Sequence, residues 1–145
     1  MSEGASEIRR AVAAECTGIA QILNTWIDRT PWMVRLYSAA QIERMIQKSF
    51  PRRVIWVVGE PVSAYLSFDP PTARVVALYC ACPGQGVGKA LLDRAREGCD
   101  HLWLTTYAPN LAAQRFYRRE GFAQTQRLHP QPSEVLAEIR MDWWR

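Results

Sequence analysis

Two stretches of the chain carry residue types that bind anions and move protons. The first is 78–92, LYCACPGQGVGKALL, in which Gly84, Gly86 and Gly88 fall within five positions after an apolar segment. Because glycine has no side chain, the backbone N–H groups of such a loop can close around an anion, and a helix that begins there points its positive end at the same place. The stretch therefore predicts a strand, a phosphate-binding loop and the first turns of a helix.

Two well-known phosphate-binding motifs do not fit this loop. A P-loop needs glycine at position 83 and serine or threonine at position 90, where the chain has Pro83 and Ala90. The dinucleotide-binding fingerprint needs a third glycine at position 89, where the chain has Lys89. Glycine-rich turns also occur as plain connections, so the loop needs a second motif before it indicates a function.

The second stretch is 110–117, NLAAQRFY, which has the composition of a short helix. Asn110, Ala113 and Tyr117 are spaced so that they share one helical face. An amide, a small side chain and a phenol would thus line one groove. Asn110 also suits a helix N-cap and Tyr117 the edge of an apolar core, so neither residue defines a site by itself.

Length and composition limit the class of protein. The 145 residues, 48% hydrophobic and 22% charged, fit one domain, 1–145, with a single core. No apolar run could span a membrane and residues 1–5 show no signal pattern, so we expect a cytoplasmic protein that does not bind membranes. The net charge of +4 is spread along the chain, which suits a small anionic ligand and does not indicate a nucleic-acid partner.

The cysteines do not indicate a metal centre. Cys16, Cys80, Cys82 and Cys99 form neither a CxxC pair nor a disulfide framework, and the chain has only two histidines. We expect no metal and four reduced cysteines. Cys80 and Cys82 would lie on one face of a strand as structural thiols, not as acyl-accepting nucleophiles.

Apolar periodicity predicts the order β-α-α-β-β-β-α-β-α-β-β. A strand, helix and strand around the glycine loop require a parallel crossover, whereas the neighbouring hairpins are antiparallel, so the sheet must be mixed. The predicted strands are 8–12, 53–58, 62–68, 74–80, 101–107, 122–128 and 135–143, and the predicted helices are 13–27, 39–50, 87–98 and 110–120.

Taken together, the two stretches resemble the GCN5-related N-acetyltransferase (GNAT) superfamily. Residues 84–92 resemble its acyl-coenzyme A pyrophosphate loop and helix, and 110–117 with 121–122 resemble its later N-x-x-A-x-x-F-Y and G-F motif. The resemblance covers essentially the whole chain and implies an α/β (α+β) fold, with a mixed central sheet of about six to seven strands and about four helices. Where the family has Arg or Gln before the loop, this chain has Pro83, and a shifted register places that position on Gln85.

The resemblance also implies an N-acetyltransferase, in which a primary amine of a small molecule or peptide attacks acetyl-CoA directly. Tyr117 would protonate the departing thiolate, and the backbone at the end of the strand 74–80, where the family's sheet opens, would hold the pantetheine arm. The residues that the resemblance assigns to the cofactor are Tyr79, Cys80, Gln85, Gly86, Val87, Gly88, Lys89, Asn110, Ala113 and Phe116.

Several questions stay open at this point. Many relatives use a carboxylate on the central strands as the base, but 75–78 offers none, which leaves Asp69, His129, Glu134 or water. In the loop 28–37, Trp32, Arg35 and Tyr37 are candidates for an acceptor pocket, with Arg35 meeting a carboxylate, although this loop equally suits a packed cover over the core.

Two other functions and the oligomeric state are also left open. The same fold could serve as a non-catalytic acyl-CoA-binding sensor or interaction module. A nucleotide-binding regulator is the weakest interpretation, because it rests on the glycine loop alone. The apolar run 141–144 is the candidate surface for a homodimer.

Overall fold

The computed structural model describes residues 7–132 and 134–145, so the N-terminal run on which the missing signal pattern was judged lies outside it. Short 3-10 turns, Ala13–Glu15 and Phe50–Arg52, precede α1 and follow α2. The helices are α1 (Cys16–Arg29), α2 (Ala39–Ser49), α3 (Val87–Arg96) and α4 (Leu111–Arg119). The strands are β1 (Ile8–Arg10), β2 (Val54–Val58), β3 (Ala64–Asp69), β4 (Arg74–Cys80), β5 (His101–Tyr107), β6 (Ala123–Leu128) and β7 (Glu138–Trp144).

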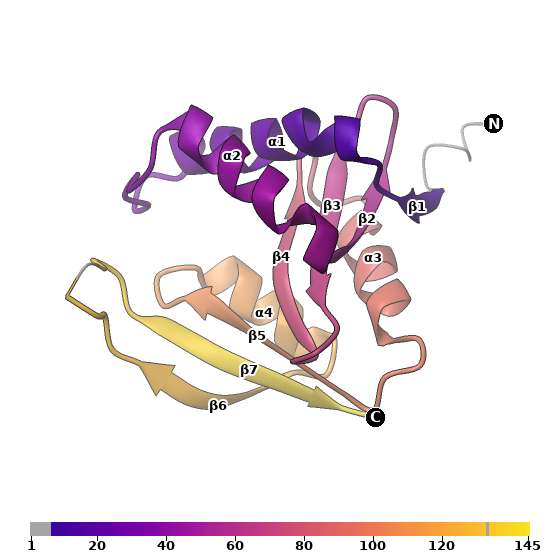
Figure 1. Cartoon of the computed structure of the whole chain (residues 1–145). Coiled ribbons are helices and arrows are strands. Elements are labelled where there is room, and N and C mark those ends of the chain that lie inside the picture. Colours follow the sequence, from indigo (N-terminus) through magenta and orange to yellow (C-terminus); the bar gives the residue numbers. More distant parts are fainter. Residues whose placement is uncertain (1–6, 133) are drawn as a thin grey trace.

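The strands form one mixed sheet in the order β1-β2-β3-β4-β5-β7-β6. Only β4 and β5 pair in parallel, and the other neighbours in the described sheet are antiparallel. In Figure 1 the β5–β7–β6 part of the sheet swings away from the β1–β4 part, and α1 and α2 lie together across the latter. This confirms the predicted mixed sheet of six to seven strands with four helices.

Two apolar cores hold the helices against the sheet. On one face α1 places Ile19 and Ile22 against Val57 and Tyr65, and on the other face α3 buries Leu91 and Leu92 completely in the larger core. Burying one leucine contributes roughly 1.5–3 kcal/mol, so this packing fixes the helix that follows the glycine loop. Helices therefore cover both faces of the sheet.

The loop between α1 and α2 is held to α1 by Arg35. The Arg35 guanidinium donates to the side-chain oxygen of Asn24 at 3.0 Å, to Asp28 at 2.9 Å and to the carbonyl of Tyr37 at 2.9 Å. Ser38 then begins α2 with a capping box, in which its hydroxyl accepts from the Gln41 N–H at 3.1 Å. Arg35 therefore sets the path of residues 30–37.

A buried carboxylate ties together the three strands at the far end of the sheet. Asp142 on β7 is 3% exposed, lies 2.7 Å from His101 Nε2 on β5, and accepts from Arg140 Nε at 3.0 Å and from the hydroxyl of Thr125 on β6. Burial alone would raise the pKa of Asp142, but the hydrogen bonds from Arg140, Thr125 and His101 outweigh it and lower the pKa to about 2. The ionised form of Asp142 is therefore a stabilising part of the fold.

The C-terminal run 141–144 is not the continuous apolar surface that was predicted for a homodimer. Met141 is fully buried in the larger core and Trp143 packs against that core, because alternate residues of β7 face inward. In this run only Trp144 is a largely exposed apolar side chain, at 58%. The prediction that the whole of 141–144 forms an apolar surface is therefore wrong.

Replacing Asp142 with Asn should destabilise the fold by about 2 kcal/mol at neutral pH, the energy that corresponds to lowering a pKa from 3.8 to about 2. Because the folded-state pKa is lowered, this stabilisation is present above the ordinary value of 3.8 and is lost as the pH falls toward 2. Urea unfolding of both proteins at several pH values measures the difference, which should shrink in acid. Asp100→Asn, at a carboxylate whose side chain is 96% exposed, is the control that should change little.

Replacing Arg35 with Ala should loosen residues 30–37 without unfolding the domain, because the hydrogen bonds of Arg35 hold this loop to α1. Hydrogen exchange should accelerate in 30–37 and stay unchanged in β4 and β5. Arg44→Ala, at an exposed position on α2, provides the control. Equal exchange of the loop in all three proteins would show that Arg35 does not brace it.

Candidate functional site

The site begins where the sheet opens between β4 and β5. In the described chain, Arg74 and Trp103 are the one register pair that joins these strands, and Trp103 N–H donates to the Ala73 carbonyl at 3.2 Å. A register shift between Ser67 and Phe68 interrupts the β3–β4 pairing nearby. Beyond the pair, a cavity of about 70 Å³ separates the strands, lined by 75–79 from β4 and 104–107 from β5. Backbone groups on these facing edges are therefore available to a ligand.

A larger groove continues from this opening toward the glycine loop. It encloses about 620 Å³ between the end of β4, the start of α3 and one side of α4. We call it the cofactor groove; its lining residues are Trp26, Leu78, Tyr79, Cys80, Pro83, Gly84, Gly86, Gly88, Lys89, Asn110, Ala112, Ala113, Phe116, Tyr117, Arg119 and Glu120.

The glycine loop has the backbone form that its sequence predicts. Gly84 and Gly86 have φ of 91° and 77°, in the left-handed region, and Gly86 is the N-cap of α3. The first intrahelical bond runs from Ala90 N–H to the Gly86 carbonyl, so the amides of residues 87–89 precede the helical ladder. These N–H groups and the helix dipole make the start of α3 a suitable place for an anion.

Close packing and ion pairs join α3 to α4 across the groove. A methyl group added to Gly88 would lie 3.5 Å from the ring of Phe116, an ordinary van der Waals distance, so this part of α3 lies beside α4. Glu120, beyond the end of α4, accepts from Arg96 at 2.7 Å and lies 3.4 Å from Lys89 Nζ. The groove therefore has walls held at a fixed separation.

Tyr117 lies at the meeting point of the groove and the strand opening. It lines both cavities although it is only 8% exposed, and its ring packs against Phe116 and Phe122. Burial, with a smaller effect from Cys80, raises the pKa of Tyr117 above its ordinary value of 10. The phenol therefore stays protonated at neutral pH and can act as a hydrogen-bond and proton donor.

The two neighbouring thiols are placed differently from each other. Cys80 is half-buried at the end of β4 and lines the cofactor groove, whereas Cys82 lies beyond the strand and is exposed, so the prediction that they share a strand face is wrong. Burial and the nearby Cys82 raise the pKa of the Cys80 thiol. A protonated thiol is a poor nucleophile, which argues against an acetylated cysteine.

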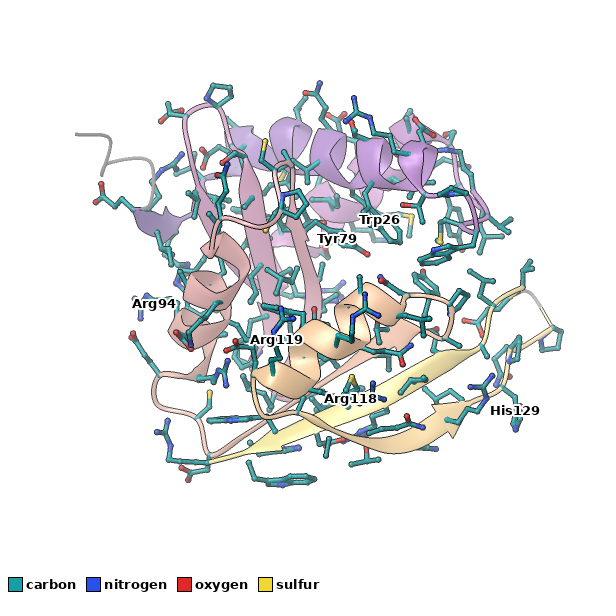
Figure 2. The ribbon with its side chains drawn as sticks, turned by 180° about the vertical axis from the view of Figure 1, so that it is seen from behind. Trp26, Tyr79, Arg94, Arg118, Arg119 and His129 are labelled. Atoms are coloured by element: carbon teal, nitrogen blue, oxygen red, sulfur yellow. The ribbon has the colours of Figure 1, made fainter. Side chains whose placement is uncertain are left out.

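A second pocket lies on the α1 and α2 side of β4. It encloses about 380 Å³ and shares Trp26 and Tyr79 with the cofactor groove. Figure 2 shows Trp26 and Tyr79 pointing toward one another between α1 and β4, with their ring centroids 5.1 Å apart. We call it the apolar pocket; its lining residues are Leu23, Trp26, Ile27, Met33, Val34, Leu36, Tyr37, Ile42, Met45, Ile46, Ser49, Arg53, Tyr79 and Tyr107.

Most residues predicted for the cofactor line the groove, but two side chains do not. Val87 packs into the larger core and Gln85 is exposed outside the lining, so only their backbones remain candidates. Asn110 lines the groove, and its side-chain oxygen also caps α4 by accepting from Ala113 N–H at 3.1 Å. Pro83, which has no N–H, lies on the groove wall.

The predicted acceptor residues separate into two groups. Tyr37 lines the apolar pocket, and Trp32 packs edge-on against Trp26, with ring centroids 5.7 Å apart, in the same aromatic cluster. Arg35 instead turns back onto α1, where its hydrogen-bonding groups contact Asn24 and Asp28. The structure gives Arg35 a bracing position that differs from the predicted contact with an acceptor carboxylate.

The candidate bases lie at unequal distances from the site. Asp69 is paired with Arg53 at 3.1 Å and lies next to the start of β4, at the opposite end of that strand from Cys80. His129 is exposed at the turn after β6, away from Trp26 and Tyr79 in Figure 2. Glu134 lines a small cavity of about 60 Å³ that adjoins the apolar pocket.

Sequence reasoning missed three residues that the fold brings to the site. Trp26 falls within the predicted helix 13–27, Tyr107 at the end of the predicted strand 101–107 and Glu138 within the predicted strand 135–143. Tyr107 and Glu138 are opposite each other in the β5–β7 register, and both line the small cavity beside the apolar pocket. Strand alternation offered one signal, since Tyr107 falls on the face opposite the buried Leu102, Leu104 and Thr106.

The described residues offer neither a metal site nor a membrane-spanning helix. Within 7–132 and 134–145, no group of three or more His, Cys, Asp or Glu side chains is arranged to hold a metal ion. Over the same residues, none of the helices combines the length and the apolar composition needed to cross a membrane.

Comparison with known proteins identifies the family. The family profile described as acetyltransferase (GNAT) domain matches residues 51–124, just over half of the chain. A comparison with curated proteins gave no match.

Solved structures share the fold at low sequence identity. A putative acetyltransferase, yncA from Salmonella typhimurium, solved with its cofactor acetyl-CoA, is 24% identical over 95% of this chain and 92% of its own, with a TM-score of 0.68. A GCN5-related N-acetyltransferase structure from Rhodopseudomonas palustris is 18% identical over 96% and 95%, with a TM-score of 0.81. Ribosomal-protein-alanine N-acetyltransferase from Brucella melitensis is 22% identical over 96% and 99%, with a TM-score of 0.70.

The matched profile spans β2 to β5, the glycine loop and the helix that carries Tyr117, and so includes every residue of the cofactor groove except Trp26. The chain therefore belongs to the acetyltransferase (GNAT) family, as its two motifs predict.

Proposed function

We propose that this GNAT acetyltransferase transfers the acetyl group of acetyl-CoA to a primary amine by direct attack, with both substrates bound at once. The observation that carries the proposal is that the cofactor groove and the apolar pocket meet at Trp26 and Tyr79, beside the open edge of β4 and Tyr117. The acetyl-CoA bound by the Salmonella protein of the same fold supports this choice of donor.

Each part of the groove suits one part of acetyl-CoA. The amides of Val87, Gly88 and Lys89 would bind the pyrophosphate at the start of α3. The open backbone near Tyr79 and Cys80 would pair with the amide groups of the pantetheine arm, as a neighbouring strand otherwise does. The opposite wall is formed by the N-cap of α4, Asn110, and by Ala113 and Phe116 on that helix.

The chemical step balances without a covalent enzyme intermediate. The neutral amine attacks the thioester carbon, the carbon–sulfur bond breaks, and the amine proton leaves as the amide forms. A backbone N–H that binds the developing oxyanion is typically worth about 10²–10³ in rate. Tyr117 would give its proton to the departing sulfur, and the proton released by the amine restores the balance through solvent.

Removal of the amine proton also needs an acceptor. An alkylamine with a pKa of about 10.4 is almost fully charged at neutral pH, so the ammonium form must first give one proton to an acceptor before the neutral amine can attack. Glu138 adjoins Tyr107, and its charge is among the causes that raise the pKa of Tyr79 and of Tyr107 after burial. We assign to Glu138 the role of accepting the amine proton through a bridging water.

Tyr117→Phe should lower kcat by about 10²-fold or more, the range for loss of a general acid, and change the Kd for acetyl-CoA little. Thiol release during amine acetylation and calorimetry with acetyl-CoA measure the two quantities. Because burial raises the pKa of Tyr117, the wild-type rate should not fall through its ionisation below about pH 10.

Tyr65→Phe is the matched control, because Tyr65 is 2% exposed in the smaller core on the other face of the sheet. Unchanged kcat in Tyr117→Phe would remove Tyr117 from the mechanism. Tight binding of acetyl-CoA with no turnover of any amine would favour a non-catalytic sensor instead.

Glu138→Gln should lower kcat/KM more at about pH 7 than at about pH 9.5, because at high pH the amine is closer to its own pKa and needs less help to lose a proton. A pH profile of both proteins with one amine measures this difference. Glu134→Gln, on the same small cavity, should show a weaker dependence. An equal loss at both pH values would assign Glu138 a structural role.

A further inference from the structure

The apolar pocket is built to enclose an uncharged body. Twelve of its fourteen lining residues are aliphatic, aromatic or Met, and the two polar ones are Ser49 and Arg53. Its volume of about 380 Å³ lies near the lower end of the range for small-ligand pockets, roughly 300–1,000 Å³. A small molecule with an apolar body would therefore fill it.

The cations near the pocket already have partners. Arg53 on the pocket wall pairs with Asp69 at 3.1 Å, and both side chains are more than three-quarters buried. Arg35 bonds to Asn24 and Asp28 on α1 and does not line the pocket. Within the described lining, a carboxylate on the acceptor would find no uncommitted cation, and burying it unpaired would be unfavourable.

The charges beside the pocket are negative. The adjoining small cavity shares Met33, Val34, Leu36 and Tyr107 with the apolar pocket and is also lined by Glu134 and Glu138. These carboxylates attract an ammonium group and repel a carboxylate on the incoming molecule. The aromatic faces of Trp26, Tyr79 and Tyr107 add a favourable surface for a cation at the junction with the cofactor groove.

We propose that the acceptor is a primary amine carried on a compact apolar body without a carboxylate, of the aralkylamine class. The apolar pocket binds the body, and the amine lies at the Trp26 and Tyr79 junction, where the two cavities meet. This inference rests on the proposed function, because it names the acceptor of the same reaction.

The test compares amines that differ in one group. Phenethylamine and L-phenylalanine share the ring and the amine, but only the second carries a carboxylate, and spermidine supplies amines without an apolar ring. We expect kcat/KM for phenethylamine to exceed that for phenylalanine and spermidine by about 10²-fold or more. Calorimetry with phenethylamine in the presence of coenzyme A gives a second readout that does not depend on turnover.

A variant at a half-exposed residue of the pocket lining tests the cause of the preference. Met45 lines the pocket and is 50% exposed, so Met45→Arg can add a cation there without opening the core. This change should narrow the preference for phenethylamine over phenylalanine by about tenfold, the effect of roughly 1.4 kcal/mol. Met45→Leu is the matched control and should leave the preference unchanged.

The outcomes separate this inference from the proposed function. Failure of the wild-type protein to bind acetyl-CoA would overturn the proposed function and the acceptor class with it. If acetyl-CoA binds, a preference for phenylalanine or spermidine, or turnover of another amine without turnover of phenethylamine, would overturn the acceptor class alone. If Met45→Arg keeps the wild-type preference for phenethylamine over phenylalanine, the charge around the pocket does not determine that preference.

Discussion

The site depends on one constraint in the sheet, namely that β4 and β5 run parallel but pair at a single described position, Arg74 with Trp103. Backbone N–H and C=O groups are costly to leave without partners, so strands that diverge expose an edge that water or a ligand must satisfy. Here the edge is the second half of β4, and it ends at Cys80 where the glycine loop begins. A ligand with amide groups and a phosphate end therefore fits the opening and the loop together.

The rest of the fold keeps this opening in place and gives it two entrances. The packing of Gly88 on Phe116 and the ion pairs of Glu120 hold α3 and α4 together on one side. On the other side, Arg35 directs the loop 30–37 so that Tyr37 reaches the apolar pocket. The donor and the acceptor can thus approach from opposite sides of β4, which suits direct transfer in one complex.

The sequence predicted the donor side of the site better than the acceptor side. Gly84, Gly86 and the cap at Asn110 follow from backbone conformation and local hydrogen bonds, which a short run of residues determines. The strand bounds of β4 and β5, the mixed sheet and the family are confirmed. Trp26, Tyr107 and Glu138 meet only because α1, β5 and β7 converge, and no local pattern encodes that meeting. The bracing position of Arg35 could not be predicted for the same reason, because its partners lie on α1 and not in its own loop.

The proposed reaction requires that the opening between β4 and β5, together with the glycine loop, holds acetyl-CoA. Backbone amide NMR during a titration with acetyl-CoA tests it most directly, because every non-proline residue reports for itself. Binding in the cofactor groove should give the largest shift changes at residues 79–80, 84–89 and 110–117. Shift changes confined to the outer face of β5 and β7, or no changes up to millimolar acetyl-CoA, would contradict it.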